Sequence, residues 1–272
     1  MEQQDLAYFK AWFENYVAKF YASVDNDKTA ILLKEDHTRR TCREIVLLGS
    51  ELGLTWRDLL LAETAALFHD VGRFLQWKQY GTFFDGESED HGLLGVKELS
   101  RYQVLSRISA AERQVIEQSI LYHNQKELPR EIAPRSVFFT KLLRDADKLD
   151  IWRLAIQLEH NENRLLERAL KERLPRTPAC SHAIIADLKM NKTSDFSYVR
   201  SQNDLKLFRL GWVFDLNFIP TCRQVLKRHY IEQLCSQLPQ TKEIQELQQD
   251  LLSHLRTRAE SDCVENKHLV PL

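Results

Sequence analysis

The adjacent residues His69 and Asp70 stand at the end of an apolar stretch that begins at Leu59 and reads LLLAETAALFHDVGR. A strongly apolar helix is normally a buried one, so this pair places an imidazole and a carboxylate close to the core. Buried polar groups of this kind must be paired or must coordinate a metal. Gly72 is typical of the residue at which a helix ends. We therefore expect other segments of the chain to supply partners for the pair.

Three further histidines and one acidic segment are candidate partners. They are His37 in EDHTRR, His91 in SEDHGLLGV, His123 in ILYHNQ, and RDADKLD with Asp145, Asp147 and Asp150. Each is expected at a helix end or on an apolar helix, from which side chains can converge inside a bundle. Four imidazoles and two carboxylates would supply two octahedral ions, and these donors suit Fe, Mn, Ni, Zn or Mg. Asp70 is the natural bridge, because each of its oxygens can bind one ion.

Composition limits the class of protein. Of 272 residues, 43% are hydrophobic and 28% charged, and the formal net charge is −1. This balance gives no reason to expect general nucleic-acid binding or membrane attachment. The N-terminus lacks the basic and apolar regions of a signal peptide. Five scattered cysteines without a CxxC pair are typical of reduced thiols. We therefore expect a cytoplasmic protein.

The apolar pattern predicts an all-α fold, since strand signals are sparse and glycine is rare. Helices are expected over residues 6–22, 36–52, 91–102, 109–123, 135–170 and 203–260, the last interrupted near Pro220 and Pro239. Thr55 can cap the helix that leads to the His-Asp pair. Residues 78–90 have the composition of an active-site loop.

A proline-rich break at Pro175 and Pro178 predicts a division of the chain. We expect a metal-binding helical core over residues 1–174 and a C-terminal helical cap over residues 175–272. The cap is expected to pack on the core as one compact unit. It would shape the pocket entrance or an interface in a homo-oligomer.

The order His, His-Asp, Asp resembles the HD-domain superfamily of metal-dependent phosphohydrolases, and LFHDVGR and RDADKLD resemble its bacterial members. The superfamily's defining ligands correspond to His37, His69, Asp70 and Asp147. His91 and His123 match the extra histidines of binuclear members, which include cyclic-dinucleotide phosphodiesterases and diiron oxygenases. The GYP signature of those phosphodiesterases is missing, and Asn124 stands where they have a second histidine. Both departures argue against cyclic-di-GMP as substrate.

The resemblance implies an HD-domain helical bundle with a C-terminal extension and two divalent ions. The first ion would be held by His37, His69, Asp70 and Asp147, with Asp145 as the alternative to Asp147. The second would be held by Asp70, His91 and His123. The implied reaction is hydrolysis of a phosphate ester, of a nucleotide or related phosphorylated metabolite, by metal-activated water.

Roles at the substrate side are less fixed by the sequence. We assign catalysis to His69, Asp70 and Arg73, and substrate contacts to Arg73, Tyr80 and Lys148. Arg73 could equally be a cation at a helix C-terminus, and Glu63 is a candidate general base. Two rival functions stay open. One is a mixed-valent diiron oxygenase, and the other is a regulatory module that binds a nucleotide without turnover.

Overall fold

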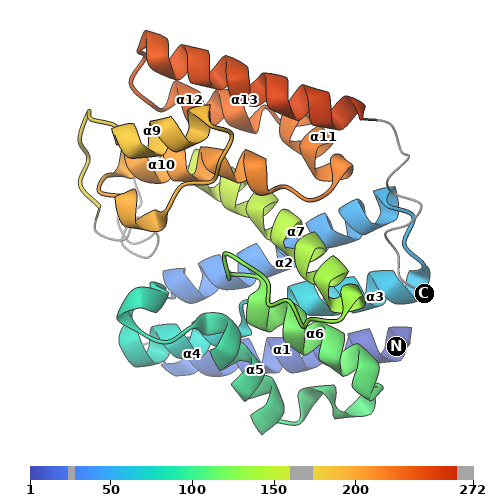
Figure 1. Cartoon of the computed structure of the whole chain (residues 1–272). Coiled ribbons are helices and arrows are strands. Elements are labelled where there is room, and N and C mark those ends of the chain that lie inside the picture. The colour runs from blue at the N-terminus through green and yellow to red at the C-terminus, as the bar shows by residue number, and fades with distance from the viewer. Residues whose placement is uncertain (24–27, 160–173, 262–272) are drawn as a thin grey trace. The chain divides into compact units, whose positions relative to one another are not determined.

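The computed structural model describes residues 1–23, 28–159 and 174–261, which form helices and no strands (Figure 1). The all-α prediction is confirmed. The chain divides into two compact units, with the boundary between Asp150 and Ile151. The predicted boundary near residue 175, and the packing of a cap on a core, stay predictions.

The first unit carries the predicted chemistry. Its helices are α1 (Gln3–Ser23), α2 (Thr29–Glu51), α3 (Trp56–Phe68), α4 (Val71–Tyr80), α5 (His91–Arg101), α6 (Ala110–Tyr122) and the first part of α7 (Pro134–Glu159), with short 3₁₀ turns at Asp85–Glu87 and Val104–Arg107. Helix α2 packs on α3, α4 packs on α5, and α6 contacts both α3 and α5. Among α2 to α6, the helices that contain or adjoin predicted ligands are thus neighbours.

An aromatic stripe on α1 fixes the position of the His-Asp pair. Apolar residues recur along α1 at helical spacing, so they form one buried face. The ring of Phe9 lies 5.7 Å from that of Phe68, and the ring of Phe13 lies 5.8 Å from that of Phe74. Phe68 immediately precedes the pair and Phe74 follows it by four residues. Burial of each such ring contributes about 1.5–3 kcal/mol, so the pair is anchored from both sides.

Side-chain caps set the starts of three helices in this unit. The Thr55 hydroxyl accepts a hydrogen bond from the Asp58 backbone N–H at 3.2 Å, which confirms the predicted cap of α3. Ser109 and Glu112 form a reciprocal capping box at α6. Asp90 caps α5 by accepting from the Leu93 N–H at 2.8 Å. This last cap holds the first turn of α5, where His91 lies.

Gly72 does not end a helix, so that prediction is wrong. The chain breaks between α3 and α4 at the His-Asp pair, and Gly72 lies in the first turn of α4. A Cβ atom on Gly72 would lie 2.2 Å from the backbone oxygen of His91 and 2.6 Å from the backbone nitrogen of Gly95. Glycine is therefore required here for the close approach of α4 to α5. Helix α3 ends at Phe68, and it is α4 that ends at a glycine, Gly81, whose φ of +64° is a left-handed conformation.

Two other boundaries differ from the sequence prediction. Helix α2 begins at Thr29, a full turn and more before the expected residue 36. Helix α4 runs to Tyr80, so the expected loop over residues 78–90 is confined to the segment after Gly81. The extra turns of α2 are stabilised by burial of Ile31 and Leu33, which local propensity does not register. The last residues of α4, in contrast, are exposed, and the helix continues to the left-handed cap at Gly81. Residues 160–170 of the helix predicted over residues 135–170 lie outside the described part of the chain, as do residues 24–27.

The second unit is built from the end of α7 and from α9 (His182–Lys189), α10 (Gln202–Leu210), α11 (Ile219–Lys227), α12 (Tyr230–Ser236) and α13 (Lys242–Glu260), with 3₁₀ turns at Phe196–Tyr198 and Gly211–Asp215. Pro220 lies in the first turn of α11, where its missing N–H costs nothing. The buried indole of Trp152 donates to the Arg209 carbonyl at 3.0 Å. His254 is half-buried against the ring of Phe214.

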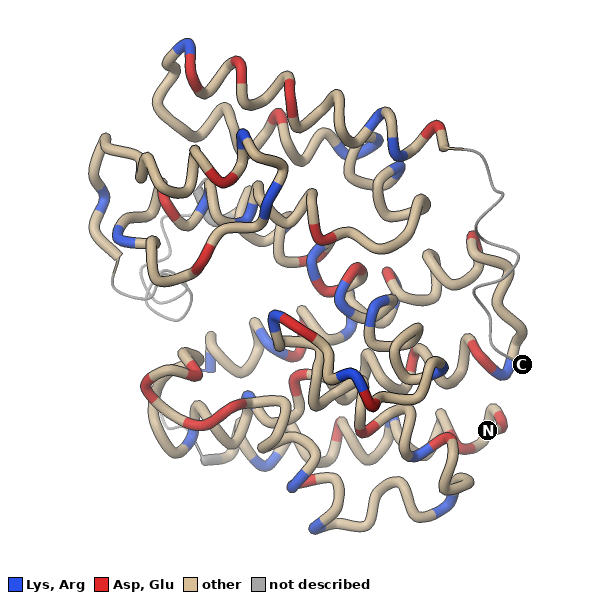
Figure 2. Tube along the Cα trace, in the orientation of Figure 1, with Lys and Arg blue, Asp and Glu red and all other residues tan. Residues whose placement is uncertain are grey.

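Charged residues of both signs are interspersed along the described chain (Figure 2). Among the described residues, no helix combines the length and the apolar character that a bilayer crossing requires.

Candidate metal centre

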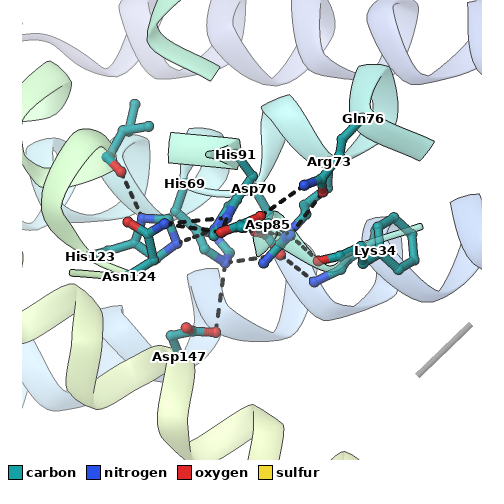
Figure 3. A network of polar contacts seen from close by, with 12 residues as sticks. Lys34, His69, Asp70, Arg73, Gln76, Asp85, His91, His123, Asn124 and Asp147 are labelled. Carbon is teal, nitrogen blue, oxygen red and sulfur yellow. Dashed lines mark hydrogen bonds and ion pairs between the residues drawn. The ribbon is translucent and has the colours of Figure 1, made fainter. Parts of the chain in front are cut away.

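All six predicted metal ligands meet inside the first unit. Figure 3 shows His69, Asp70, His91, His123 and Asp147 near one another. The six ligands come from α2, from the junction of α3 and α4, from the start of α5, from the residue after α6, and from α7. In that order they are His37, His69 with Asp70, His91, His123 and Asp147. The four imidazoles and Asp70 are buried, and Asp147 is half-buried. His69, Asp70, His91 and His123 lie at helix ends, whereas His37 and Asp147 lie inside α2 and α7.

One half of the cluster is formed by His37, His69, Asp70 and Asp147. The Nε2 atoms of the two imidazoles lie 3.2 Å apart. Asp70 Oδ2 lies 3.5 Å from each of them, and Asp147 Oδ1 lies 3.0 Å from His37 Nε2 and 3.7 Å from His69 Nε2. Asp147 Oδ1 is buried and has no well-aligned hydrogen bond among the described residues. An acceptor in that condition fits a cation ligand.

The other half contains His91 and His123, whose Nε2 atoms lie 3.0 Å apart. Asp70 Oδ1 lies 3.4 Å from His91 Nε2. The two oxygens of Asp70 thus face different imidazoles: Oδ2 lies near His37 and His69, and Oδ1 lies near His91, which is paired with His123.

Two of the imidazoles are oriented by backbone carbonyls at helix ends. His69 Nδ1 lies 2.7 Å from the Ala66 oxygen, and His123 Nδ1 lies 2.7 Å from the Ile120 oxygen. Carbonyls in the last turn of a helix have no partner within the helix, so they accept these bonds readily. Because a carbonyl can only accept, Nδ1 must carry the proton in both rings. Each Nε2 then presents a lone pair to the cluster.

The other two imidazoles are oriented by carboxylates. His37 Nδ1 lies 2.7 Å from Asp150 Oδ2, and His91 Nδ1 lies 2.7 Å from Asp85 Oδ2. A carboxylate that holds the outer nitrogen of a metal-binding histidine fixes the tautomer and raises ligand basicity. All four rings consequently direct Nε2 inward.

The protonation of His91 and His123 is a further reason why these residues fit divalent cations. In neutral His91 and His123 the Nδ1 protons are committed to Asp85 and to the Ile120 carbonyl, so both Nε2 atoms are acceptors. Two buried acceptors 3.0 Å apart repel each other unless a proton or a cation lies between them. Burial lowers the pKa of each ring to about 4, with nearby positive charge (Arg73 at His91, His69 at His123) acting in the same direction. A shared proton is therefore disfavoured at neutral pH, and a metal ion satisfies both lone pairs.

Protonation elsewhere in the cluster also suits metal binding, with one exception. Burial alone would raise the pKa of Asp70, but Lys34 and the surrounding imidazoles and Arg73 hold it well below its ordinary value. Burial lowers the pKa of His69. Burial also opposes charge on His37, yet the adjacent carboxylates of Asp147 and Asp150 outweigh it and raise the pKa to about 9. His37 must therefore lose a proton when a metal ion binds.

Two cations contact Asp70, and the sequence pointed to only one of them. Arg73 Nε lies 3.5 Å from Asp70 Oδ1, as its position after the pair suggests. Lys34 Nζ lies 2.7 Å from Asp70 Oδ2 and 5.3 Å from the centre of the Phe83 ring. Lys34 precedes His37 by three residues, so both side chains occupy one face of α2. That spacing is the signal that could have identified it.

The remaining candidates lie elsewhere. Tyr80 is exposed, and its hydroxyl donates to Glu89 at 2.7 Å rather than to the cluster. Glu63 forms an ion pair with Lys10 at 2.5 Å. Lys148 and Asp145 are both buried on α7, the helix that carries Asp147. The three carboxylates of RDADKLD thus differ in placement, because Asp150 holds His37 Nδ1 and Asp147 faces Nε2 of the same ring.

A helical unit with a buried cluster of imidazoles and carboxylates is an all-α fold with side chains that could hold metal ions. A model of the HD domain family matches residues 35–188, more than half of the chain. The chain therefore belongs to the HD domain family, within the superfamily of metal-dependent phosphohydrolases. Comparisons with curated proteins and with solved structures gave no match.

Proposed function

We propose that this protein hydrolyses a phosphate ester, of a nucleotide or a related phosphorylated metabolite, with two divalent metal ions. His37, His69, Asp70 and Asp147 hold the first ion, and Asp70, His91 and His123 hold the second. When bound, such ions would lower the pKa of a water molecule and neutralise charge on the phosphoryl group. Family membership supports the reaction class, and the ligand set supports two ions.

The observation that carries the proposal is the division of Asp70 between the two imidazole pairs. Its Oδ2 atom lies 3.5 Å from His37 Nε2, and its Oδ1 atom lies 3.4 Å from His91 Nε2. A carboxylate in this position can bridge two cations with one oxygen for each. In this proposal His69 and Asp70 are catalytic because they would hold the ions to which the substrate binds.

Positive side chains beside Asp70 favour an anionic substrate. Lys34 and Arg73 are each 14% exposed and contact opposite oxygens of Asp70. When divalent ions occupy the carboxylate, the ammonium and guanidinium groups are available to oxygens of a phosphoryl group. Arg73 also hydrogen-bonds Asp85 and the Phe83 carbonyl, so a bound phosphate would be connected to the loop after α4. Tyr80 and Lys148 stay candidates for contacts with the rest of the substrate.

The first experiment is elemental analysis with electron paramagnetic resonance on protein purified without chelator, followed by a phosphate-release screen over nucleotides and sugar phosphates. We expect two equivalents of metal and release of phosphate from members of one substrate class. Asp70→Asn should lower metal content and hydrolysis by more than the roughly 10- to 100-fold that loss of an outer hydrogen-bond partner costs. Asp250→Asn, on the exposed face of α13, is the matched control and should retain both.

Two results would contradict the proposal. One is a fully metal-loaded protein that hydrolyses no phosphate ester in the panel. The other is two irons with a mixed-valent signal and substrate-dependent oxygen consumption, which would identify the diiron oxygenase. In the first case, tight nucleotide binding without turnover would identify the regulatory module.

A further inference from the structure

The loop after α4 contributes a carboxylate, Asp85, to the surroundings of the metal centre. Asp85 Oδ2 lies 2.7 Å from His91 Nδ1 and accepts from Asn124 Nδ2 at 3.3 Å. Asp85 Oδ1 accepts from Arg73 Nη1 at 2.7 Å and from Gln76 Nε2 at 2.8 Å. Each oxygen of Asp85 therefore has its own donors. Of these partners, His91 is the one that directs a second nitrogen into the cluster.

We propose that Asp85 is a positioning residue for the second metal position, where it holds His91 in the tautomer that presents an Nε2 lone pair. This inference rests on the proposed function, because the ion concerned is one of the two that the reaction uses. It adds a residue outside the ligand set, and it assigns that residue to one metal position only.

The first metal position has a counterpart of different construction. Asp150 accepts from His37 Nδ1 at 2.7 Å and from Arg40 Nε at 2.6 Å. Its side chain is fully buried on α7, whereas the side chain of Asp85 is 30% exposed on a loop. The first position is thus supported from a helix and the second from a loop. A change in the loop should alter the second position alone.

Asparagine at position 85 tests the role with little change in shape. Arg73 and Gln76 donate to Oδ1, so the amide oxygen is retained at that place and the amide NH₂ faces His91 Nδ1. A donor opposite Nδ1 favours the tautomer with the proton on Nε2. That proton blocks the lone pair which a metal ion requires. The carboxylate of Asp85 is therefore needed for its acceptor character at Oδ2.

The experiment compares Asp85→Asn with Asp90→Asn. Asp90 belongs to the same loop and accepts from Asn124 and Gln125, and asparagine preserves its cap of α5. Metal-free proteins are examined by ¹⁵N NMR of the imidazole nitrogens, which reports the tautomer. The same proteins are then titrated with Mn²⁺ by calorimetry.

We expect wild type and Asp90→Asn to bind two equivalents and to keep the Nδ1–H tautomer of His91. Asp85→Asn should convert His91 to the Nε2–H tautomer and weaken one equivalent by roughly 10- to 100-fold, leaving the other unchanged. Unchanged tautomer and affinities, or equal weakening of both equivalents, would overturn the inference. Failure of wild type to bind two Mn²⁺ would instead count against the two-metal function, while the tautomer measurement would still test Asp85.

Discussion

Replacement of Gly72 by alanine tests whether close packing of α4 on α5 positions His91. The added Cβ would lie 2.2 Å from the His91 oxygen and 2.6 Å from the Gly95 nitrogen. Both are backbone atoms and cannot rotate away. Ordinary van der Waals contact begins at 3.4 Å, so the two helices must separate by about 1.2 Å beside His91. His91 is the first residue of α5 and moves with it.

The magnitude follows from two opposing terms. Alanine is favoured over glycine inside a helix by about 1 kcal/mol, so without the clash Gly72→Ala would be stabilising. Overpacking of this kind costs about 1–3 kcal/mol, and here the obstacle is rigid backbone, so we expect the upper part of that range. The net loss in the free energy of unfolding corresponds to a decrease in Tm of roughly 2–8 °C for a unit of this size. Metal affinity at the second position should also fall.

The assays are thermal unfolding of the metal-free protein and Mn²⁺ titration by calorimetry. Gly95→Ala is the control, because its nearest neighbour is a side-chain methyl of Val71 at 3.2 Å, which can yield. We expect that variant to differ little from wild type in Tm and to bind two equivalents. A Gly72→Ala protein as stable as wild type, with two Mn²⁺ bound at wild-type affinity, would refute the argument.

Three further predictions concern the whole protein and two side chains outside the cluster. Removal of metal by a chelator should lower Tm, since an ion at 100 times its Kd stabilises the folded state by about 2.7 kcal/mol. Added Mn²⁺ should restore the Tm, and a Tm that the chelator leaves unchanged would argue against metal binding. Burial, assisted by the charge of Glu63, raises the pKa of the Cys42 thiol to about 12. The thiolate fraction of Cys42 at pH 8 is then about 1,000-fold below that of an ordinary thiol. Iodoacetamide should therefore label Cys42 far more slowly in folded than in urea-unfolded protein, which mass spectrometry of the peptide would report. Burial and then Arg258 lower the pKa of His254 below its ordinary 6.5, so the unfolded chain binds more protons and stability is lost as the pH falls below about 6.5. His254→Gln should reduce the loss of Tm between pH 7.5 and pH 5, whereas exposed His229→Gln should not; equal losses in both variants would contradict this sign.

The sequence by itself determined the fold class and the ligand types. Helical periodicity is a local property, so it can be read without knowledge of packing. The same is true of a cap such as Thr55, whose partner Asp58 lies three residues away. The motifs around His69 and Asp147 indicated the HD domain family, and the family match over residues 35–188 bears this out.

Only the tertiary structure decided how those residues meet. The two oxygens of Asp70 face imidazoles whose residues lie 33 positions before it and 21 positions after it in the chain, and no local pattern encodes that division. Asp85 was expected in an active-site loop, but only the packing of α4 and α5 showed that it meets His91. Gly72 looked like a helix end, because a glycine required by a neighbouring backbone and one required by a left-handed turn are the same letter in the sequence. Long-range packing distinguishes them, and it also gives each carboxylate its chemical role.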